Sequence, residues 1–236
     1  MKAEILARLN EARDDRQPVV LATKLSTGEQ VVLPHPDAPP GLAAAAKLAL
    51  ERDESGTVKM TDGDWFLAAY NPPLRLIIVG AVHIAQALVR MAEQLGLTVI
   101  VVDPRRSFAS ADRFPNVRVL TDWPDEAMDT LTLNERTAVV TLTHDPKLDD
   151  PALDRALKSP AFYVGALGSR RTHAARLARL RGLGHNDEAL ARIRGPVGLN
   201  LEAVTAPEIA LSIMAEFVAV RRNSPLGHKD KALAAA

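Results

Sequence analysis

The sequence contains no cysteine among its 236 residues. A disulfide, a thiolate metal site, an iron–sulfur cluster and a thiol nucleophile are therefore excluded, and any chemistry must come from oxygen and nitrogen groups or from a bound cofactor. The sequence also lacks an excess of charge, because 29 basic residues balance 29 acidic ones. This balance disfavours nucleic acid as a partner, since proteins that bind a polyanion typically carry a basic excess.

Long apolar runs are missing as well. The longest one, from Leu76 to Val82, is too short to span a bilayer, and the charged segment from Met1 to Asp15 has no apolar stretch of the kind that a signal peptide needs. We therefore expect a soluble cytoplasmic protein with no membrane association. With 47% hydrophobic and 25% charged residues, the composition is globular and allows one large or two modest cores.

The first 72 residues predict a small α+β domain. Apolar periodicity and turn residues indicate two helices and two strand hairpins. In chain order these elements are a helix around Ile5, Leu6 and Leu9, a hairpin of Val19–Ala22 and Val31–Leu33, an alanine-rich helix over Leu42–Glu51, and a hairpin of Thr57–Met60 and Trp65–Tyr70. The segment Asn71-Pro72-Pro73 favours an extended connector and predicts a domain boundary.

Residues 73–223 show a different pattern, in which short apolar strands alternate with helical segments. Buried strands are predicted at Leu76–Val79, Val99–Val102, Val117–Leu120, Ala138–Leu142 and Phe162–Val164. This alternation predicts the α/β class, with a Rossmann-like, doubly wound parallel sheet that binds ligands at the carboxyl ends of its strands. The spacing of Thr205 and Glu208 marks the start of the last helix. We expect residues 224–236 to form a flexible tail.

The first candidate loop begins at Gly80, directly after the first strand of this domain. Asp103 lies 23 residues later, close to the offset at which a carboxylate binds ribose hydroxyls in dinucleotide folds. Val82 stands where the phosphate-binding pattern has its second glycine, so NAD(P) binding is less favoured than plain strand–helix packing. His83 and Arg105 are further candidate ligand contacts, and their alternatives are packing against the helix and a solvated loop charge.

The second candidate loop precedes another helix and brings together two glycines, a hydroxyl and two guanidinium groups. These residues are Gly165, Gly168, Ser169, Arg170 and Arg171. Free N–H groups and the helix dipole favour an anion at such a place, so we predict a phosphate or carboxylate site here. At most one of the two adjacent arginines is expected to touch the ligand. The alternative is that Ser169 or Thr172 only caps the helix while both arginines point to water.

A third loop follows the fourth predicted strand and contains His144 and three carboxylates. These groups suit a hard cation or acid–base chemistry, but the loop also has simple structural explanations. Asp145 before Pro146 predicts a turn, and Asp150 before Pro151 predicts a helix start. We predict no metal site, and we expect His144 to face the ligand crevice. A last glycine-containing loop, Gly195–Asn200, either lines the same crevice or merely turns the chain.

Four segments together carry a resemblance to a known family. They are Leu142–Asp149, Tyr163–Thr172, Gly195–Leu199 and Thr205–Ala210. Over about residues 75–222, the chain resembles the C-terminal domain of the XdhC/CoxI family, whose members are accessory proteins of xanthine dehydrogenase and related molybdenum hydroxylases. The resemblance implies a Rossmann-like, non-enzymatic chaperone that binds the molybdenum cofactor, protects it during sulfuration and delivers it to the apoenzyme.

The resemblance also implies ligands and partners. The cofactor is molybdopterin or its dinucleotide form, and the partners are a molybdenum hydroxylase apoenzyme, a cysteine desulfurase and a second copy in a homodimer. With the loops above, the predicted cofactor-binding residues are Gly80, His83, Asp103, Arg105, His144, Gly165, Gly168, Ser169, Arg170 and Arg171. No catalytic residue is predicted.

Two features depart from the family's usual pattern. Family members commonly have Gly-x-Gly-His at the first loop, where this chain has Gly80-Ala81-Val82-His83. They also usually carry a Gly-Gly-Cys segment in an N-terminal domain, whereas this sequence has no cysteine. Two other hypotheses therefore stay open. One is an NAD(P)-dependent oxidoreductase that uses Asp103, and the other is a protein–protein adaptor with a vestigial nucleotide crevice.

Overall fold

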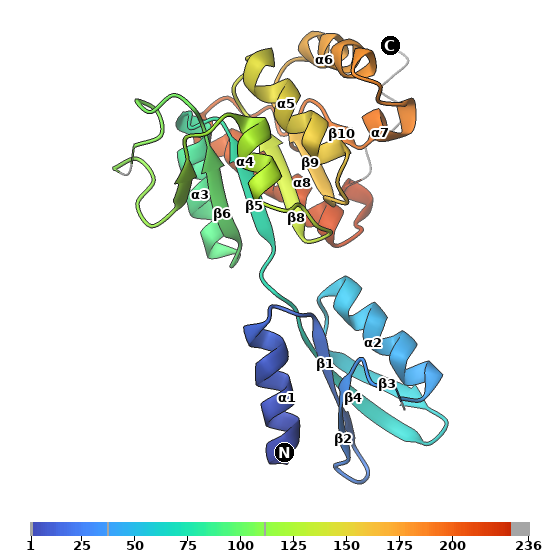
Figure 1. Ribbon diagram of the computed structural model, residues 1–236. Helices are drawn as coiled ribbons and strands as arrows, with labels where there is room; N and C mark the ends of the chain where they lie inside the picture. Colours follow the sequence, from blue (N-terminus) through green and yellow to red (C-terminus); the bar gives the residue numbers. More distant parts are fainter. Residues whose placement is uncertain (1, 37, 111, 228–236) are drawn as a thin grey trace. The chain divides into compact units, whose positions relative to one another are not determined.

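The computed structural model describes residues 2–36, 38–110 and 112–227 (Figure 1). The chain divides into two compact units, Met1–Pro72 and Pro73–Ala236. Each unit has its own sheet and its own core. Most of the tail expected over residues 224–236 lies outside the described residues, and Pro225–Gly227 form a short 3₁₀ helix, η1.

The first unit is an antiparallel sheet with a helix on each face. Its elements are α1 (Ala3–Asp14), β1 (Val19–Lys24), β2 (Gln30–Leu33), α2 (Pro40–Arg52), β3 (Gly56–Met60) and β4 (Gly63–Tyr70), and the strand order is β2-β1-β4-β3. Alternate residues of β1 face opposite sides: Val20 packs in the cluster that contains Leu42 of α2, and Leu21 packs with Leu9 of α1. The two predicted hairpins are confirmed.

The second unit is built on a six-stranded sheet in which all the pairings are parallel. The strands are β5 (Arg75–Val79), β6 (Thr98–Val102), β7 (Arg118–Leu120), β8 (Thr137–Thr141), β9 (Tyr163–Ala166) and β10 (Ile193–Arg194). Their order across the sheet is β10-β9-β8-β5-β6-β7, which is the Rossmann order 3-2-1-4-5-6 read from the other edge. The predicted Rossmann-like doubly wound fold is thereby confirmed.

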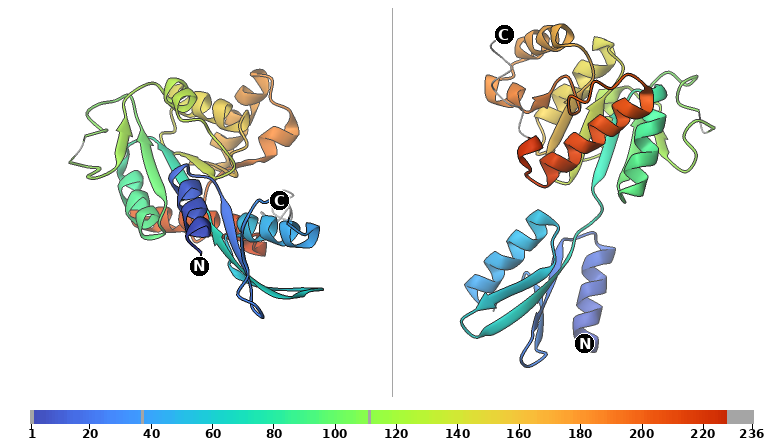
Figure 2. Two further views of the ribbon diagram at one scale, coloured as in Figure 1. Left: turned by 60° about the horizontal axis from the view of Figure 1, so that its bottom comes forward. Right: turned by 180° about the vertical axis from the view of Figure 1, so that it is seen from behind.

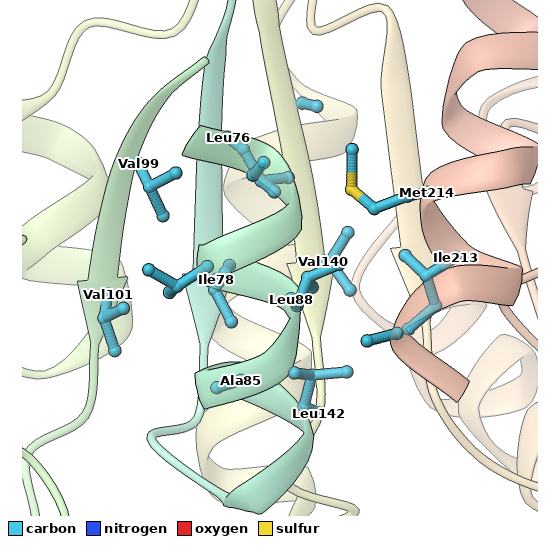
Figure 3. Close-up of a cluster of buried hydrophobic side chains, with 14 of the residues drawn as sticks. Leu76, Ile78, Ala85, Leu88, Val99, Val101, Val140, Leu142, Ile213 and Met214 are labelled. Atoms are coloured by element: carbon cyan, nitrogen blue, oxygen red, sulfur yellow. The ribbon is translucent and has the colours of Figure 1, made fainter. Parts of the chain in front are cut away.

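Helices cover both faces of this sheet. One face carries α3 (His83–Gln94) and α8 (Ala206–Arg221), which lie side by side in Figure 2. The other carries α4 (Pro124–Thr130), α5 (Pro146–Leu157), α6 (Arg170–Gly182) and α7 (Asp187–Ala191). In β5, Leu76 and Ile78 join the core on the α3 side (Figure 3), whereas Ile77 and Val79 join the opposite one. Because both faces are covered, the strands are continuously apolar.

The helix α3 begins at His83, so this candidate ligand contact is the first residue of that helix. One helix start and one strand differ from the sequence-based prediction. The helix α5 begins at Pro146, because the Asp145 side chain accepts a hydrogen bond from the Lys147 amide (2.9 Å) and caps it there; Pro151 lies inside that helix. The short strand β10 was not predicted, since two residues carry too little periodicity to identify a strand.

The strand order places a topological switch point between β5 and β8. The chain leaves β5 and β8 toward opposite faces of the sheet, and such a point is where open α/β sheets bind ligands. The loops that follow β5, β8 and β9 therefore begin at neighbouring positions on the carboxyl edge of the sheet. None of the helices in the described part of the chain combines the length and apolar character of a bilayer span.

Candidate functional site

The turn from β9 into α6 is shaped by one glycine and one serine. Gly168 has a φ of +144°, and a Cβ placed on it would lie 3.1 Å from the Thr172 side chain, so only glycine fits without strain. Ser169 is the N-cap of α6, and its Oγ accepts a hydrogen bond from the Thr172 amide (3.1 Å). The capping role that the sequence left as an alternative for Ser169 is therefore present.

This cap leaves the first amide groups of α6 available. Leu167 donates its N–H to the Thr141 carbonyl (2.9 Å), whereas the amides of Gly168, Ser169, Arg170 and Arg171 have no hydrogen-bond acceptor among the residues that the structure describes. Free amides at a helix N-terminus point outward along the axis and carry the positive end of the dipole. The turn can consequently bind negatively charged oxygen atoms.

The two adjacent arginines stand beside these amides. Arg170 and Arg171 are the first two residues of α6, and both side chains are exposed. No ion pair to either guanidinium exists within the described ranges. Both arginines are thus exposed, as in the alternative that the sequence left open, and a contact between one of them and an anion stays a prediction.

His144 brings the loop after β8 to the same place. It has a φ of +62°, a left-handed conformation that is uncommon for a residue other than glycine, and its side chain is exposed. Its ring atom Nδ1 lies 3.7 Å from the position that a Cβ on Gly168 would take. Two of the three candidate loops therefore meet, with an imidazole beside the free amides of α6.

The loop after β5 is joined to this arrangement through Gly80. With a φ of +108°, Gly80 turns toward Thr143, and a Cβ on it would lie 2.5 Å from Thr143 Cγ2. The Ala81 amide is used by Asp103 Oδ2 (2.8 Å), and the Val82 side chain packs against the core on the α3 side. His83 is exposed at the first position of α3. The loop thus supports the Thr143 loop, and its Ala81 amide is not free for a phosphate.

Asp103 is placed differently from the sequence-based expectation. Its carboxylate is 0% exposed and accepts hydrogen bonds from the Ala81 amide (2.8 Å), the Arg105 amide (3.0 Å) and the Arg105 guanidinium (2.9 and 2.7 Å). Burial raises the pKa of Asp103, but the bonds from Arg105 and Ala81 outweigh this effect and hold the pKa below its ordinary value. With both oxygens engaged, the geometry favours a structural anchor over the predicted contact to a ribose.

Arg105 is the member of the Asp103–Arg105 ion pair that reaches the surface. Its side chain is 38% exposed and lies over the Phe108 ring, with 4.5 Å between the guanidinium carbon and the ring centroid. Hydrogen bonding to Asp103 raises the pKa of Arg105, with smaller contributions from Asp145 and Asp149. These two carboxylates belong to the β8–α5 segment, so Arg105 adds positive charge near the His144 loop.

Gly165 does not lie in the turn from β9 into α6. It lies inside β9, paired with Val140 and Arg194, and a Cβ on it would come within 2.4 Å of Val197 Cγ2. The expectation that Gly165 contacts a cofactor is therefore not supported, because its role is close packing. The Gly195–Asn200 loop likewise turns the chain: the Val197 amide bonds to the Ala166 carbonyl and the Gly198 amide to Glu216 on α8.

The carboxylates of the β8–α5 segment each have a protein partner. Asp145 caps α5, Asp149 accepts from the Thr143 hydroxyl (2.7 Å), and Asp150 pairs with Arg179. Within the described ranges, no group of three or more His, Cys, Asp or Glu side chains is arranged to hold a metal ion. The three carboxylates of this segment are thus engaged by groups of the protein itself.

One buried residue near the site was missed by sequence reasoning. Arg176 on α6 is 1% exposed, and its Nη2 donates to the Leu167 carbonyl (2.8 Å) and lies 3.4 Å from Asp149 Oδ2. A signal was available, because Arg176 shares the core-facing stripe of α6 with Leu180, four residues later. A charged residue on such a stripe indicates a buried polar contact.

Comparisons with known proteins agree with this arrangement. Residues 76–217 match the XdhC Rossmann domain family. The chain is 36% identical over 156 residues to the molybdenum cofactor insertion chaperone PaoD of Escherichia coli (strain K12), covering 66% of this chain and 43% of that protein. It is 32% identical over 164 residues to the uncharacterized protein YqeB of the same organism, covering 69% of this chain and 30% of that protein.

Two further proteins are similar. A probable xanthine dehydrogenase subunit of Bacillus subtilis (strain 168) is 29% identical over 159 residues, covering 67% of this chain and 46% of that protein. The chain thus spans less than half the length of each curated relative named here. The crystal structure of a xanthine dehydrogenase from Bacillus halodurans has the same fold, with a TM-score of 0.72 and 23% identity over 93% of this chain and 67% of that one.

The family match extends over more than half of the chain. It begins in β5, ends in α8, and includes all three candidate loops. The chain therefore belongs to the XdhC family, through its Rossmann domain.

Proposed function

We propose that this protein binds the molybdenum cofactor and delivers it to the apoenzyme of a molybdenum hydroxylase. The observation that carries the proposal is the row of free amides from Gly168 to Arg171, beside His144, at the carboxyl edge of the sheet. The similarity to the insertion chaperone PaoD supports it, since that protein's name states the same role. The role is that of an accessory protein, and no catalytic residue is assigned.

The residues present fit the anionic part of this cofactor. Molybdopterin carries a phosphate, and a phosphate suits the free amides at the start of α6 together with one exposed guanidinium, from Arg170 or Arg171. His144 and Arg105 add donors on the neighbouring loops. When bound, the cofactor supplies the metal centre that the hydroxylase needs, while this chain's residues hold and shield it.

The experiment that tests the proposal measures retention of the cofactor. Molybdenum cofactor released from a molybdenum hydroxylase is mixed with the purified protein and separated by size. We expect the wild type to retain the pterin and the double variant Arg170→Ala, Arg171→Ala to retain at least tenfold less. Arg90→Ala, which removes an exposed arginine of α3, is the matched control and should behave like the wild type. Pterin that passes through unbound with the wild type contradicts the proposal.

The two alternative functions give different results. Isothermal titration with NAD and NADP should show no heat near millimolar ligand, where binding is worth about 4 kcal/mol, because Asp103 has no oxygen left for a ribose. Heat at that concentration would favour the oxidoreductase. Co-purification with a hydroxylase that survives substitution of all the loop residues would favour the adaptor. Dinucleotide specificity, a cysteine desulfurase partner, a homodimer and a cytoplasmic location remain predictions.

A further inference from the structure

An ion pair lies buried beneath the candidate site, and the proposed function has not used it. Arg176 of α6 and Asp149 of α5 are each 1% exposed, with 3.4 Å between Arg176 Nη2 and Asp149 Oδ2. Arg170 and Arg171, on the same helix, are exposed. Neither member of the buried pair can reach a ligand, because both are covered by the protein.

Each member of the pair contacts one of the two loops that form the site. Arg176 Nη2 donates to the Leu167 carbonyl (2.8 Å), in the loop directly before Gly168. Asp149 Oδ1 accepts from the Thr143 hydroxyl (2.7 Å) and the Thr143 amide (3.4 Å), in the loop directly before His144. The two loops are therefore connected by a continuous chain of contacts from the Leu167 carbonyl to Thr143.

The pair is not explained by stability. Burial lowers the pKa of Arg176 and raises the pKa of Asp149, so the surroundings disfavour both charges. The Nε and Nη1 atoms of Arg176 are also buried without an acceptor among the described residues. An apolar pair of similar volume commonly packs as well as a buried ion pair or better, so these charges need another reason to be there.

We propose that Arg176 and Asp149 are positioning residues that hold the β8–α5 and β9–α6 loops at the separation at which the free amides of α6 and His144 can bind one anion. The proposal rests on the proposed function and adds to it two residues that never touch the ligand. The Thr143 side chain extends the contact to Gly80, so the loop after β5 is fixed by the same pair.

The test removes both charges at once and keeps the volume, with the double variant Asp149→Leu, Arg176→Met. The matched control is Asp150→Leu, Arg179→Met, since Arg179 Nη2 and Asp150 Oδ1 join the same two helices (3.0 Å) but contact neither loop. Without ligand, we expect amide exchange at Leu167, whose N–H is bonded to the Thr141 carbonyl, to become at least tenfold faster in the test variant, with shifted His144 ring signals, and to change less than twofold in the control.

Binding of inorganic pyrophosphate is the second readout. We expect its affinity to fall at least tenfold in the test variant and less than twofold in the control. A test variant that matches the control in both loop exchange and affinity overturns the proposal. If the wild type binds neither pyrophosphate nor the molybdenum cofactor, the proposed function fails. The amide exchange rate at Leu167 then still shows whether Arg176 and Asp149 hold the two loops in place.

A conservative variant covers the case in which the double variant does not fold. Arg176→Lys keeps the charge, but the lysine ammonium ends one bond short of Nη2, the single nitrogen that contacts both the Leu167 carbonyl and Asp149. We expect faster exchange at Leu167 with unchanged exchange at Ile77 and Val139 in the sheet. Wild-type exchange at Leu167 in this variant contradicts the proposal.

Discussion

Two glycines allow the loops at the carboxyl edge to approach one another. Gly168 and Gly80 both have positive φ angles, and a Cβ on either would meet a threonine side chain, at 3.1 Å and 2.5 Å respectively. The left-handed His144 lies in the loop after β8, next to Thr143, and its Nδ1 is 3.7 Å from the Cβ position of Gly168. Backbone conformations of this kind persist where the surrounding structure enforces them, and they gather at functional sites.

Substitution of Gly168 by alanine should therefore affect both stability and binding. The new Cβ meets Thr172, and a φ of +144° strains an L-residue, so we expect a loss of about 1–3 kcal/mol in the free energy of unfolding and at least tenfold weaker cofactor retention. Urea denaturation measures the first effect. Gly182→Ala is the control, since nothing lies within 4 Å of its Cβ position, and it should stabilise α6 slightly.

Asp103 gives a prediction about pH. Its pKa is lowered in the folded protein, so it contributes stability that is fully present above its unfolded pKa, at about pH 4, and is lost as the pH falls through the folded pKa. We expect Asp103→Asn to be less stable than the wild type at pH 7, with a difference that shrinks below about pH 4. Unfolding curves from pH 7 to pH 2 measure it.

The matched control for this prediction is Glu135→Gln, which removes an exposed loop carboxylate. A difference between Asp103→Asn and the wild type that stays constant across the same pH range would show that the charge of Asp103 is not what anchors Arg105 and the Ala81 amide.

Residue roles were predictable from the sequence only where they depend on near neighbours. A hydroxyl cap at Ser169 or Thr172 was predictable from the local sequence, and the structure has it at Ser169. The close approach of Gly165 to Val197 and the partners of the buried Arg176 depend on contacts between distant segments, which one sequence does not show. The engagement of Asp103 by Arg105 was missed for another reason: the offset from Gly80 indicates a position on the sheet edge, not the direction in which the carboxylate points.

At the level of the elements, the strands of the parallel sheet were predicted well because each is a short, continuous apolar run. The predicted Leu76–Val79 and Val99–Val102 lie within the observed β5 and β6. The start of α5 was harder, because Asp145-Pro146 and Asp150-Pro151 carry the same local signal. The Thr143 hydroxyl accepts from the Asp145 amide (3.1 Å) and helps to fix the first of the two as the cap.

The cap of α5 gives a prediction at this level. Asp145→Ala removes the acceptor for the Lys147 amide and should lower the free energy of unfolding by about 1 kcal/mol. Asp145→Asn keeps a good N-cap and should recover most of that loss. Chemical denaturation of the two variants measures the difference. Equal stability of Asp145→Ala and the wild type would place the helix start elsewhere, for example at Asp150.

For the whole molecule, the strand order explains why residues far apart in the sequence form one site. The order β10-β9-β8-β5-β6-β7 makes β8 the neighbour of both β5 and β9, so the loops after these three strands share one edge. The fold class and this edge were predictable from the alternation of strands and helices. Which loop offers free donors was not, because the Ala81 amide is taken by Asp103 while those of Ser169 to Arg171 are left free.

We infer above all that the turn into α6 binds negatively charged oxygen atoms. The most direct measurement is a titration of the isotopically labelled protein with inorganic pyrophosphate, followed by the NMR signals of the backbone amides. We predict saturable shifts at Gly168, Ser169, Arg170 and Arg171, and none at the start of α7, where Asp187 and Glu188 repel an anion. Unchanged signals from Gly168 to Arg171, or equal shifts at both helix starts, would contradict the account.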